Sequence, residues 1–438
     1  MKRRVPALVV AVILLVAGLR VYLPLASEPK FQGRRVSYWF KEYCGSGQNG
    51  NYDWIREREA LAALQKMGTN AVPYLLEQAF SIREDSAAKS NLYRFINEAP
   101  RSWGLPLLVN ARTMCEEAPF ALEELKPPAG QILPLLQKHL KSTSQFERNQ
   151  ALIILGTVGD GAEQAVPYLA KGLEDTNGHT RLIAMQSLGW IGPRAEASVP
   201  ALIEVLKESP GTNHAGMGLR AAITLGKIGG AAVPAAPLVR KLFEQEANWS
   251  SRCSLATALF RIDPGQTDAL AFLMDGVTNH QPANDRGSAV WGLGEIGPGA
   301  KMAVPALLQA LDSTNAMLYA RISTALKQMG VPPETFLPAM KKQLEANDPT
   351  TRVNAAARVL EIVPADHEAH LVLMKEIEQG ALFQDFAIET LGGAGPAASE
   401  AIPILRKLAK KDPQGKRDRE AAAAKALKRI EAKPEGKN

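Results

Sequence analysis

The sequence predicts an all-α protein, an α-solenoid in which helical hairpins stack into a superhelix with a repeat of about 34 residues. Apolar stretches end in the related phrases LGTVG, LGWIG, LGKIG and LGEIG. Prolines beside aliphatic residues recur at intervals of 33, 34 and 71 residues, the last covering two units: Pro167, Pro200, Pro234 and Pro305. Because each unit of such an array buries its apolar face against its neighbours, we expect one elongated body.

The N-terminus carries a basic end, Lys2 to Arg4, followed by an uncharged apolar run from Val5 to Leu19. This pattern is typical of an export or anchoring signal. A cleavage site near Ala26 would need a small side chain three positions before the cut, but Pro24 occupies this part of the chain. We therefore favour a single-pass anchor, formed by residues 1–26, that is retained in the mature protein. The basic end is then expected inside and the array on the extracytoplasmic side. The alternative is a secreted or periplasmic protein after signal cleavage.

Residues 27–55 are interpreted as an N-terminal cap and linker, in which Val36, Trp39 and Phe40 cover the apolar face of the first unit. Within this segment, GSGQNG places Gly45, Gly47 and Gly50 at the spacing of a dinucleotide fingerprint. That fingerprint requires a strand before it and a helix after it. A helical, aromatic stretch enters it here, so a turn is favoured and no cofactor is predicted.

The clearest unit runs from Gln164 to Gly192. Pro167 suits the first turn of a short helix, where a missing N–H costs nothing, and a polar turn follows at Asp175 to Gly178. A second helix is expected to begin near Thr180 and to end at Gly192. In LGxIG the Leu and Ile should face the core and the glycines should tighten and end the helix, while the variable residue decorates its surface.

We expect such units over residues 56–430, with an irregular stretch at 80–130, and a disordered basic tail at 431–438. The formal net charge is +6, but from Arg406 to the end there are 12 Lys or Arg against 5 Asp or Glu. The rest of the chain is therefore close to neutral, and nucleic-acid binding is not favoured. The three cysteines form no CxxC pair and predict neither a metal site nor disulfide bridges: Cys44, Cys115 and Cys253.

The second-helix phrases RNQALIILGTVG, RLIAMQSLGWIG, RCSLATALFRID and RGSAVWGLGEIG resemble the HEAT repeat, and specifically its bacterial, phycobilisome-lyase-type variety. The resemblance covers roughly residues 56–430 and implies a scaffold that binds a protein partner through its concave helix face. In the family, the arginine that opens this helix commonly bonds to an Asp of a nearby turn. Asp175 and Asp312 match that turn position, whereas Glu208 and Asn279 depart from it.

The residues most able to contact a partner are the variable letters of the LGxIG phrases, Thr157, Trp190, Lys227 and Glu295, together with Trp291. Tryptophan concentrates contact energy in interfaces, although packing between helices is an equally ordinary role. His179, His214 and His280 recur beside Thr-Asn pairs in three turns. Stacked hairpins lie about 8–10 Å apart, too far for two imidazoles to share a metal ion, so solvated turn residues are favoured and no metal is predicted.

No Gly-x-Ser-x-Gly, HExxH or Walker motif is present, so no enzyme is predicted. The leading hypothesis is a membrane-anchored or exported scaffold for an unknown protein partner. A bilin lyase-like or other enzyme-associated role is the first alternative, because phycobilisome lyases contain similar repeats. A nucleic-acid-binding protein similar to HEAT-like DNA glycosylases is the second.

Overall fold

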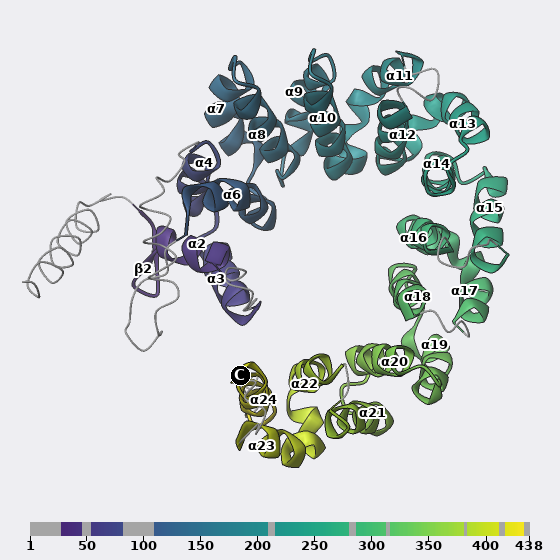
Figure 1. Ribbon diagram of the computed structural model, residues 1–438. Helices are drawn as coiled ribbons and strands as arrows, with labels where there is room; N and C mark the ends of the chain where they lie inside the picture. Colours follow the sequence, from purple (N-terminus) through teal and green to yellow (C-terminus); the bar gives the residue numbers. More distant parts are fainter. Residues whose placement is uncertain are drawn as a thin grey trace, which may run out of the picture. The chain divides into compact units, whose positions relative to one another are not determined.

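The computed structural model describes residues 28–45, 54–81, 109–208, 215–279, 286–311, 316–380, 383–410 and 417–432. These residues are overwhelmingly helical (Figure 1). They cluster into two compact units, the first ending at Val205 and the second beginning at Leu206, within one helix. The first unit holds β1 Lys30–Phe31, β2 Arg34–Arg35, α2 Val36–Gly45, α3 Trp54–Met67, α4 Val72–Ala79, α6 Ala111–Leu125, α7 Ala129–Leu140, α8 Gln145–Gly156, α9 Val166–Gly172, α10 Gly178–Ile191 and most of α11 Val199–Glu208.

The second unit is a succession of helical hairpins. In each hairpin a first helix packs on the second helix that follows it, and each second helix also packs on the next second helix along the chain. The first helices are α13 Ala236–Gln245, α15 Thr267–Thr278, α17 Val304–Ala310, α19 Pro333–Lys342, α21 His367–Glu378 and α23 Ile402–Lys410. The second helices are α12 Ala215–Ile228, α14 Trp249–Ile262, α16 Arg286–Ile296, α18 Ala316–Gln328, α20 Pro349–Ile362, α22 Gln384–Gly393 and α24 Arg417–Ile430. These alternating sets confirm the predicted all-α solenoid.

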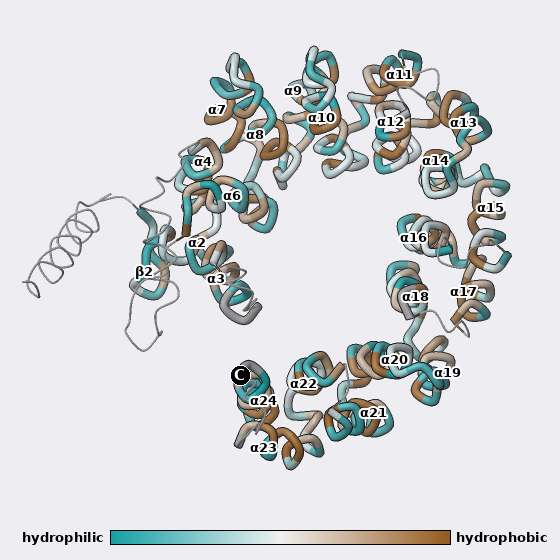
Figure 2. Tube along the Cα trace, viewed as in Figure 1, coloured by the Kyte–Doolittle hydropathy of each residue, from teal (hydrophilic) through white to brown (hydrophobic). Residues whose placement is uncertain are grey.

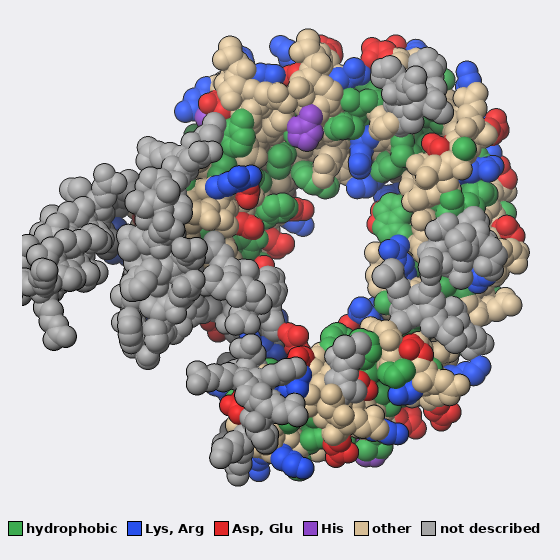
Figure 3. All heavy atoms as spheres, viewed as in Figure 1, with side chains coloured by type: hydrophobic (Ala, Val, Ile, Leu, Met, Phe, Trp, Pro, Cys, Tyr) green, Lys and Arg blue, Asp and Glu red, His purple; other side chains and the backbone are tan. Residues whose placement is uncertain are grey.

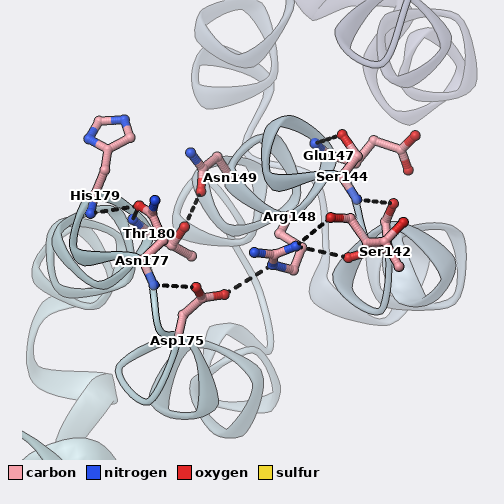
Figure 4. Close-up of polar contacts among 10 residues, drawn as sticks. Ser142, Ser144, Glu147, Arg148, Asn149, Asp175, Asn177, His179 and Thr180 are labelled. Atoms are coloured by element: carbon pink, nitrogen blue, oxygen red, sulfur yellow. Dashed lines mark hydrogen bonds and ion pairs between the residues drawn. The ribbon is translucent and has the colours of Figure 1, made fainter.

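The hairpin α9–α10 shows why the sequence folds this way. Pro167 lies in the first turn of α9, as predicted. Helix α10 begins two residues before the expected Thr180, because the Asn177 side chain accepts hydrogen bonds from the backbone N–H groups of His179 and Thr180 at 2.9 and 3.2 Å (Figure 4). Such a cap satisfies N–H groups that have no partner inside the helix.

The LGxIG phrase performs the two predicted structural tasks. Its closing glycine adopts a left-handed φ that other residues rarely take, as at Gly192 (φ 66°) and Gly229 (φ 81°), and this ends the second helix. Its first glycine permits close packing: a Cβ on Gly226 would lie 2.7 Å from Cα of Ala258 on the neighbouring second helix. The Leu residues of the four phrases are fully buried: Leu155, Leu188, Leu225 and Leu293. Figure 2 shows hydrophobic and hydrophilic residues alternating along each helix, which is the pattern of a half-buried helix.

A short 3₁₀ segment links several second helices to the first helix of the next hairpin. Three of these segments begin with Gly-Pro, and each contains one alanine with non-helical backbone angles that is fully buried: Ala195, Ala300 and Ala398. The periodicity of the sequence did not predict these segments. Their signal is the small residue at a fixed distance after each LGxIG phrase, because only a small side chain fits where the chain bends between two packed helices.

Polar contacts tie neighbouring hairpins together. The Arg148 guanidinium donates to the carboxylate of Asp175 in the next turn at 3.0 Å, which confirms the Arg–Asp contact implied by the family resemblance (Figure 4). It also donates to the carbonyls of Ser142 and Thr143, both at 3.1 Å. Arg352 makes the same two carbonyl contacts in its own hairpin, so anchoring the preceding turn is a further role of this arginine. Asp312 lies outside the described residues.

The segment expected as an N-terminal cap forms a small ladder, β1 antiparallel to β2, followed by α2. Val36 and Phe40 are fully buried, and the indole N–H of Trp39 donates to the carbonyl of Phe31 at 3.2 Å. Helix α2 packs on α3 and α6. Of the predicted glycine-rich turn, only Gly45 is described, as the last residue of α2.

In the stretch expected to be irregular, residues 82–108 lie outside the described part of the chain. Helix α6 follows them, with Pro119 in its interior, and it packs on α3, α4 and α8. At the other end, α24 closes the described hairpins and packs on α22 and α23. Of the predicted basic tail, residues 433–438 lie outside the description. The predicted domain boundaries therefore stay predictions.

The expected single-pass N-terminal anchor requires correction. Within the ranges that the structure describes, no helix has both the length and the apolar character needed to cross a bilayer. This finding does not support the anchor or the extracytoplasmic placement of the array derived from it. The segment on which the expectation fell, residues 1–26, lies outside those ranges.

Candidate partner-binding face

Three of the predicted contact residues come together on the second helices of the second unit. Lys227 of α12, with Trp291 and Glu295 of α16, lines a shallow depression centred on α14. We call this the α14 depression; its other lining residues are Ile223, Gly226, Ser254, Thr257, Ala258 and Arg261. Figure 3 shows hydrophobic and basic side chains beside one another over these helices.

The depression exists because its floor is made of small residues. Gly226 of α12 faces Ala258 of α14 so closely that no larger side chain fits between the helix backbones. Larger side chains stand around this floor, and the indole of Trp291 is 45% exposed. The enclosed volume is about 20 Å³, far below the roughly 300–1,000 Å³ of pockets that hold small molecules. A hollow of this size holds only a small group, and its open mouth lets an apolar side chain of a partner lie across it.

The charged residues at its rim differ in how they are held. Arg261 of α14 donates to the Glu295 carboxylate of α16 at 3.3 Å, with both side chains partly buried. Lys227 forms neither an ion pair nor a hydrogen bond with any part of the chain that the structure describes. The hydroxyl of Thr257 donates to the carbonyl of Cys253 in its own helix at 2.8 Å. Lys227 is therefore the rim cation available to a partner.

Two further predicted contact residues, Thr157 and Trp190, lie in the first unit and are not part of the α14 depression. Thr157 departs from the expectation that the variable letter decorates the surface: it is only 5% exposed. It caps the end of α8, and its hydroxyl donates to the carbonyl of Ile154 at 2.8 Å. Trp190 is 38% exposed and lies against the preceding second helix, where a Cβ on Gly156 would come within 2.7 Å of its ring. Trp190 therefore combines packing with exposure.

Of the three histidines expected in equivalent turns, the structure describes only His179. His179 is exposed at the start of α10, where its backbone N–H donates to the capping Asn177. In Figure 4 its ring points away from the labelled polar contacts. His214 and His280 lie outside the described residues. Among the residues described, no group of three or more His, Cys, Asp or Glu side chains is arranged to hold a metal ion.

The sequence pattern missed Arg261, Thr257 and Ile223 as members of the site. Arg261 occupies the variable position of LFRID, which lacks both glycines of the LGxIG phrase, so this residue was not counted with Lys227 and Glu295 among the contact residues. Once the phrases are aligned, Arg261 falls 34 residues from each of them. Ile223, Thr257 and Trp291 fall on the position one helical turn earlier. Column-by-column alignment of the repeats was the signal that could have found them.

A cluster of titratable side chains lies between α21 and the 3₁₀ segment before α23. The carboxylate of Glu400 meets Nδ1 of His370 at 2.6 Å and Nδ1 of His367 at 2.7 Å. Burial alone would raise the pKa of Glu400, but the hydrogen bonds to His370 and His367 outweigh it and the pKa is lowered. His370 is fully buried, and its Nε2 has no hydrogen-bond partner within the described chain. This cluster locks α21 to the next hairpin.

All three cysteines are buried as free thiols. Burial raises the pKa of Cys253 to about 12 and also raises that of Cys44. The pKa of Cys115 is raised by burial too, and its Sγ donates to the carbonyl of Ala79 at 3.1 Å. These thiols are poor nucleophiles at neutral pH and act as small packing residues.

A family model described as HEAT repeats matches residues 132–219 and 270–361. No curated protein matches the sequence.

Several solved structures are similar at low identity. An engineered protein is 17% identical with a TM-score of 0.31, over 90% of this chain and 99% of that one. The CpcE–CpcF complex of phycocyanin lyase from Nostoc sp. PCC7120 is 18% identical with a TM-score of 0.36, over 65% and 98%. Yeast importin-beta, Kap95p, is 15% identical with a TM-score of 0.35, over 89% and 56%, so this chain spans about half of it.

The assignment rests on the chain's own helical hairpins and on the matched repeats. The two matched stretches include α8 to α10 in the first unit and α16 to α20 in the second. The hairpins around them follow the same order of first and second helices. Residues 132–219 and 270–361 are therefore HEAT repeats within a chain of similar helical hairpins.

Proposed function

We propose that this protein is a scaffold that binds a protein partner through the second-helix face of its second unit. The observation that carries the proposal is the convergence of Trp291, Lys227 and the Arg261–Glu295 ion pair around an apolar depression. A partly exposed tryptophan beside an apolar hollow is a typical anchor of protein interfaces. Stacked helical repeats present extended surfaces for such contacts.

The proposal is for binding and not for catalysis. The polar groups at the depression are already engaged in structural contacts: Arg261 holds Glu295, and Thr257 bonds to its own helix. A catalytic site needs a nucleophile or base within hydrogen-bond reach of a reacting atom. The lysine at the rim instead supplies a cation on a long stem, which suits recognition of a partner's charge.

Photocrosslinking at two positions tests the proposal in the cells that make the protein. A photoreactive amino acid replaces Trp291 in one variant and Met302 in the other; Met302 is 74% exposed and lies outside the depression. We expect position 291 to give a saturable crosslink to one protein partner, in roughly stoichiometric amount, that is absent at position 302. Crosslinks to the same abundant proteins from both positions would contradict the proposal.

A further inference from the structure

The near-neutral charge of the array conceals a segregation of charge within it. Helices α12, α14, α16 and α18 together carry seven basic residues and one acidic residue, Glu295. The basic residues are Arg220, Lys227, Arg252, Arg261, Arg286, Arg321 and Lys327. Among the first helices of these hairpins, α15 contains two aspartates and no basic residue, α17 contains no charged residue, and α13 carries two basic residues and one acidic residue. The basic charge in this part of the unit is therefore concentrated on the second helices.

Part of this charge is used within the fold. Glu295 is held by Arg261, and Lys327 pairs with Glu361 of α20 at 3.1 Å. Arg252 lies over the rings of Phe243 and Phe272. Arg321 donates to the carbonyl of Gly287 at 3.4 Å. This contact involves no carboxylate, so it does not neutralise the charge of the arginine. Arg220 is exposed on α12, and Lys227 stands at the rim of the α14 depression. A partner therefore meets a surface with an excess of positive charge beside one apolar hollow.

We propose that the occupant of this face is an extended, acidic segment of a partner protein that lays one apolar side chain over the α14 depression and against Trp291. Charge complementarity selects the acidic character, because carboxylates of the segment would meet Lys227 and Arg220. The apolar floor of Gly226 and Ala258 favours an apolar side chain at this point of the segment. This inference rests on the proposed scaffold function and names its partner class.

The size of the face sets the length of the segment. Neighbouring packed helices are about 8–10 Å apart, so the face from α12 to α16 is roughly 16–20 Å wide. An extended chain rises about 3.3 Å per residue and crosses that width with five or six residues. The segment therefore has room for one central apolar residue with two acidic residues on either side. Nucleic acid would use the same cations, and its bases stack on aromatic rings, so competition with an oligonucleotide is part of the test.

Fluorescence anisotropy with labelled peptides tests the inference on the full-length protein. The probe is Gly-Glu-Asp-Phe-Glu-Asp-Gly; the comparison peptides replace Phe by Ala, or all four acidic residues by Lys. We expect saturable binding of the probe, binding weakened about fivefold or more without the Phe, and none of the Lys peptide. Raising salt from low to physiological levels should weaken the probe's binding.

Two variants and a control locate the site. Lys227→Glu should weaken probe binding about tenfold, because it reverses the charge at the rim. Trp291→Ala should reduce the difference in affinity between the Phe probe and the peptide in which Ala replaces Phe. Lys227→Gln, which keeps the stem, should give an intermediate loss. Lys171→Glu, an exposed charge change on α9 in the first unit, should leave binding unchanged. Equal thermal melting of these proteins shows that losses are not due to unfolding.

Two results would overturn the inference. One is probe binding that does not depend on Phe or on Lys227. The other is binding of single-stranded oligothymidine that competes with the probe and matches its affinity, which would indicate a general polyanion surface. Failure of the peptide to bind, together with a specific crosslink at position 291, would reject the acidic segment but retain the scaffold. Loss of the crosslink itself would reject the scaffold.

Discussion

Gly226 sets how closely two second helices approach at the candidate site. Its α-carbon faces the backbone of Ala258, and a Cβ there would lie 2.7 Å from Cα and 2.9 Å from Cβ of that residue. The neighbour is backbone and cannot rotate away as a flexible side chain would. The same glycine therefore maintains both the packing of α12 on α14 and the floor of the α14 depression.

We predict that Gly226→Ala destabilises the protein by about 1–3 kcal/mol, because overpacking forces the two helices apart. Gly216→Ala in the same helix is the matched control, since a Cβ there meets no atom within 4 Å. That control should be neutral or more stable by about 0.5–1 kcal/mol, because alanine favours the helix. Urea unfolding measures both free energies. Equal effects of the two substitutions would show that helix propensity, and not contact, governs Gly226.

Glu400 is the residue whose charge state is most clearly linked to folding. Its pKa is lowered in the folded protein because hydrogen bonds to His370 and His367 outweigh the effect of burial. A carboxyl group with a lowered folded pKa contributes stability above its unfolded pKa, about 4.3 for glutamate, and loses it as the pH falls through the folded value. The contribution is therefore present at neutral pH and absent in strong acid.

We predict that Glu400→Gln lowers the free energy of unfolding by about 1–3 kcal/mol at pH 7, because the buried His370 loses a charged hydrogen-bond partner. The difference from the wild type should shrink as the pH falls below about 4. Glu389→Gln on α22, at an exposed site, should change stability little at any pH. Thermal melting from pH 7 to pH 3 measures this, and a difference that does not depend on pH would exclude the charge as the cause.

At the scale of elements, the turn between α9 and α10 has a second role besides reversing the chain. Asp175 accepts hydrogen bonds from the Asn177 backbone N–H at 2.8 Å and from Arg148 of α8 at 3.0 Å. Burial alone would raise the pKa of Asp175, but these two hydrogen bonds outweigh it and lower the pKa. One carboxylate thus orders the turn and fastens it to the preceding hairpin.

We predict that Asp175→Ala costs about 1–3 kcal/mol, since it removes two hydrogen bonds to a shielded carboxylate. Asp385 of α22 pairs with Arg419 of α24 at 2.7 Å but is 69% exposed, so Asp385→Ala should cost less than about 1 kcal/mol. Hydrogen exchange should rise at the start of α10 in the Asp175 variant only. A larger loss from the Asp385 variant would contradict the dependence on burial.

The elements differ in how far sequence alone predicts them. Repeat periodicity predicted the hairpins, and the capping Asn177 and the left-handed Gly192 follow from local backbone chemistry. The buried Ala195 and its 3₁₀ segment were not predicted, because the bend arises from packing between successive hairpins. The candidate site was predicted in part: Lys227, Trp291 and Glu295 meet, whereas Thr157 is buried. Arg261 escaped prediction because its phrase lacks the glycine that marks the repeat.

At the scale of the whole molecule, contacts between second helices run from each hairpin to the next within each compact unit. Stability in such an array is close to a sum of terms for each repeat and for each interface between neighbours. A defect in one hairpin should therefore weaken its neighbours more than distant hairpins. The equivalent buried leucines of the LGxIG phrases, Leu188 in α10 and Leu293 in α16, allow this to be tested in the two units.

We predict that Leu293→Ala, which removes a fully buried side chain at a cost of about 2–5 kcal/mol, raises hydrogen exchange most in α14 to α18 and least in α7 to α10. Leu188→Ala should give the reverse pattern, with the increase centred on α8 to α11. Each variant thus serves as the control for the other, since the substitution and its burial are matched. If exchange rises equally throughout both units in either variant, the chain unfolds in one all-or-none step. Its stability would then not be a sum of terms for each repeat and each interface between neighbours. A localised response would also show that the α14 depression depends on its own hairpins for its shape, because Leu293 lies two residues from Trp291 in the helix that forms one wall.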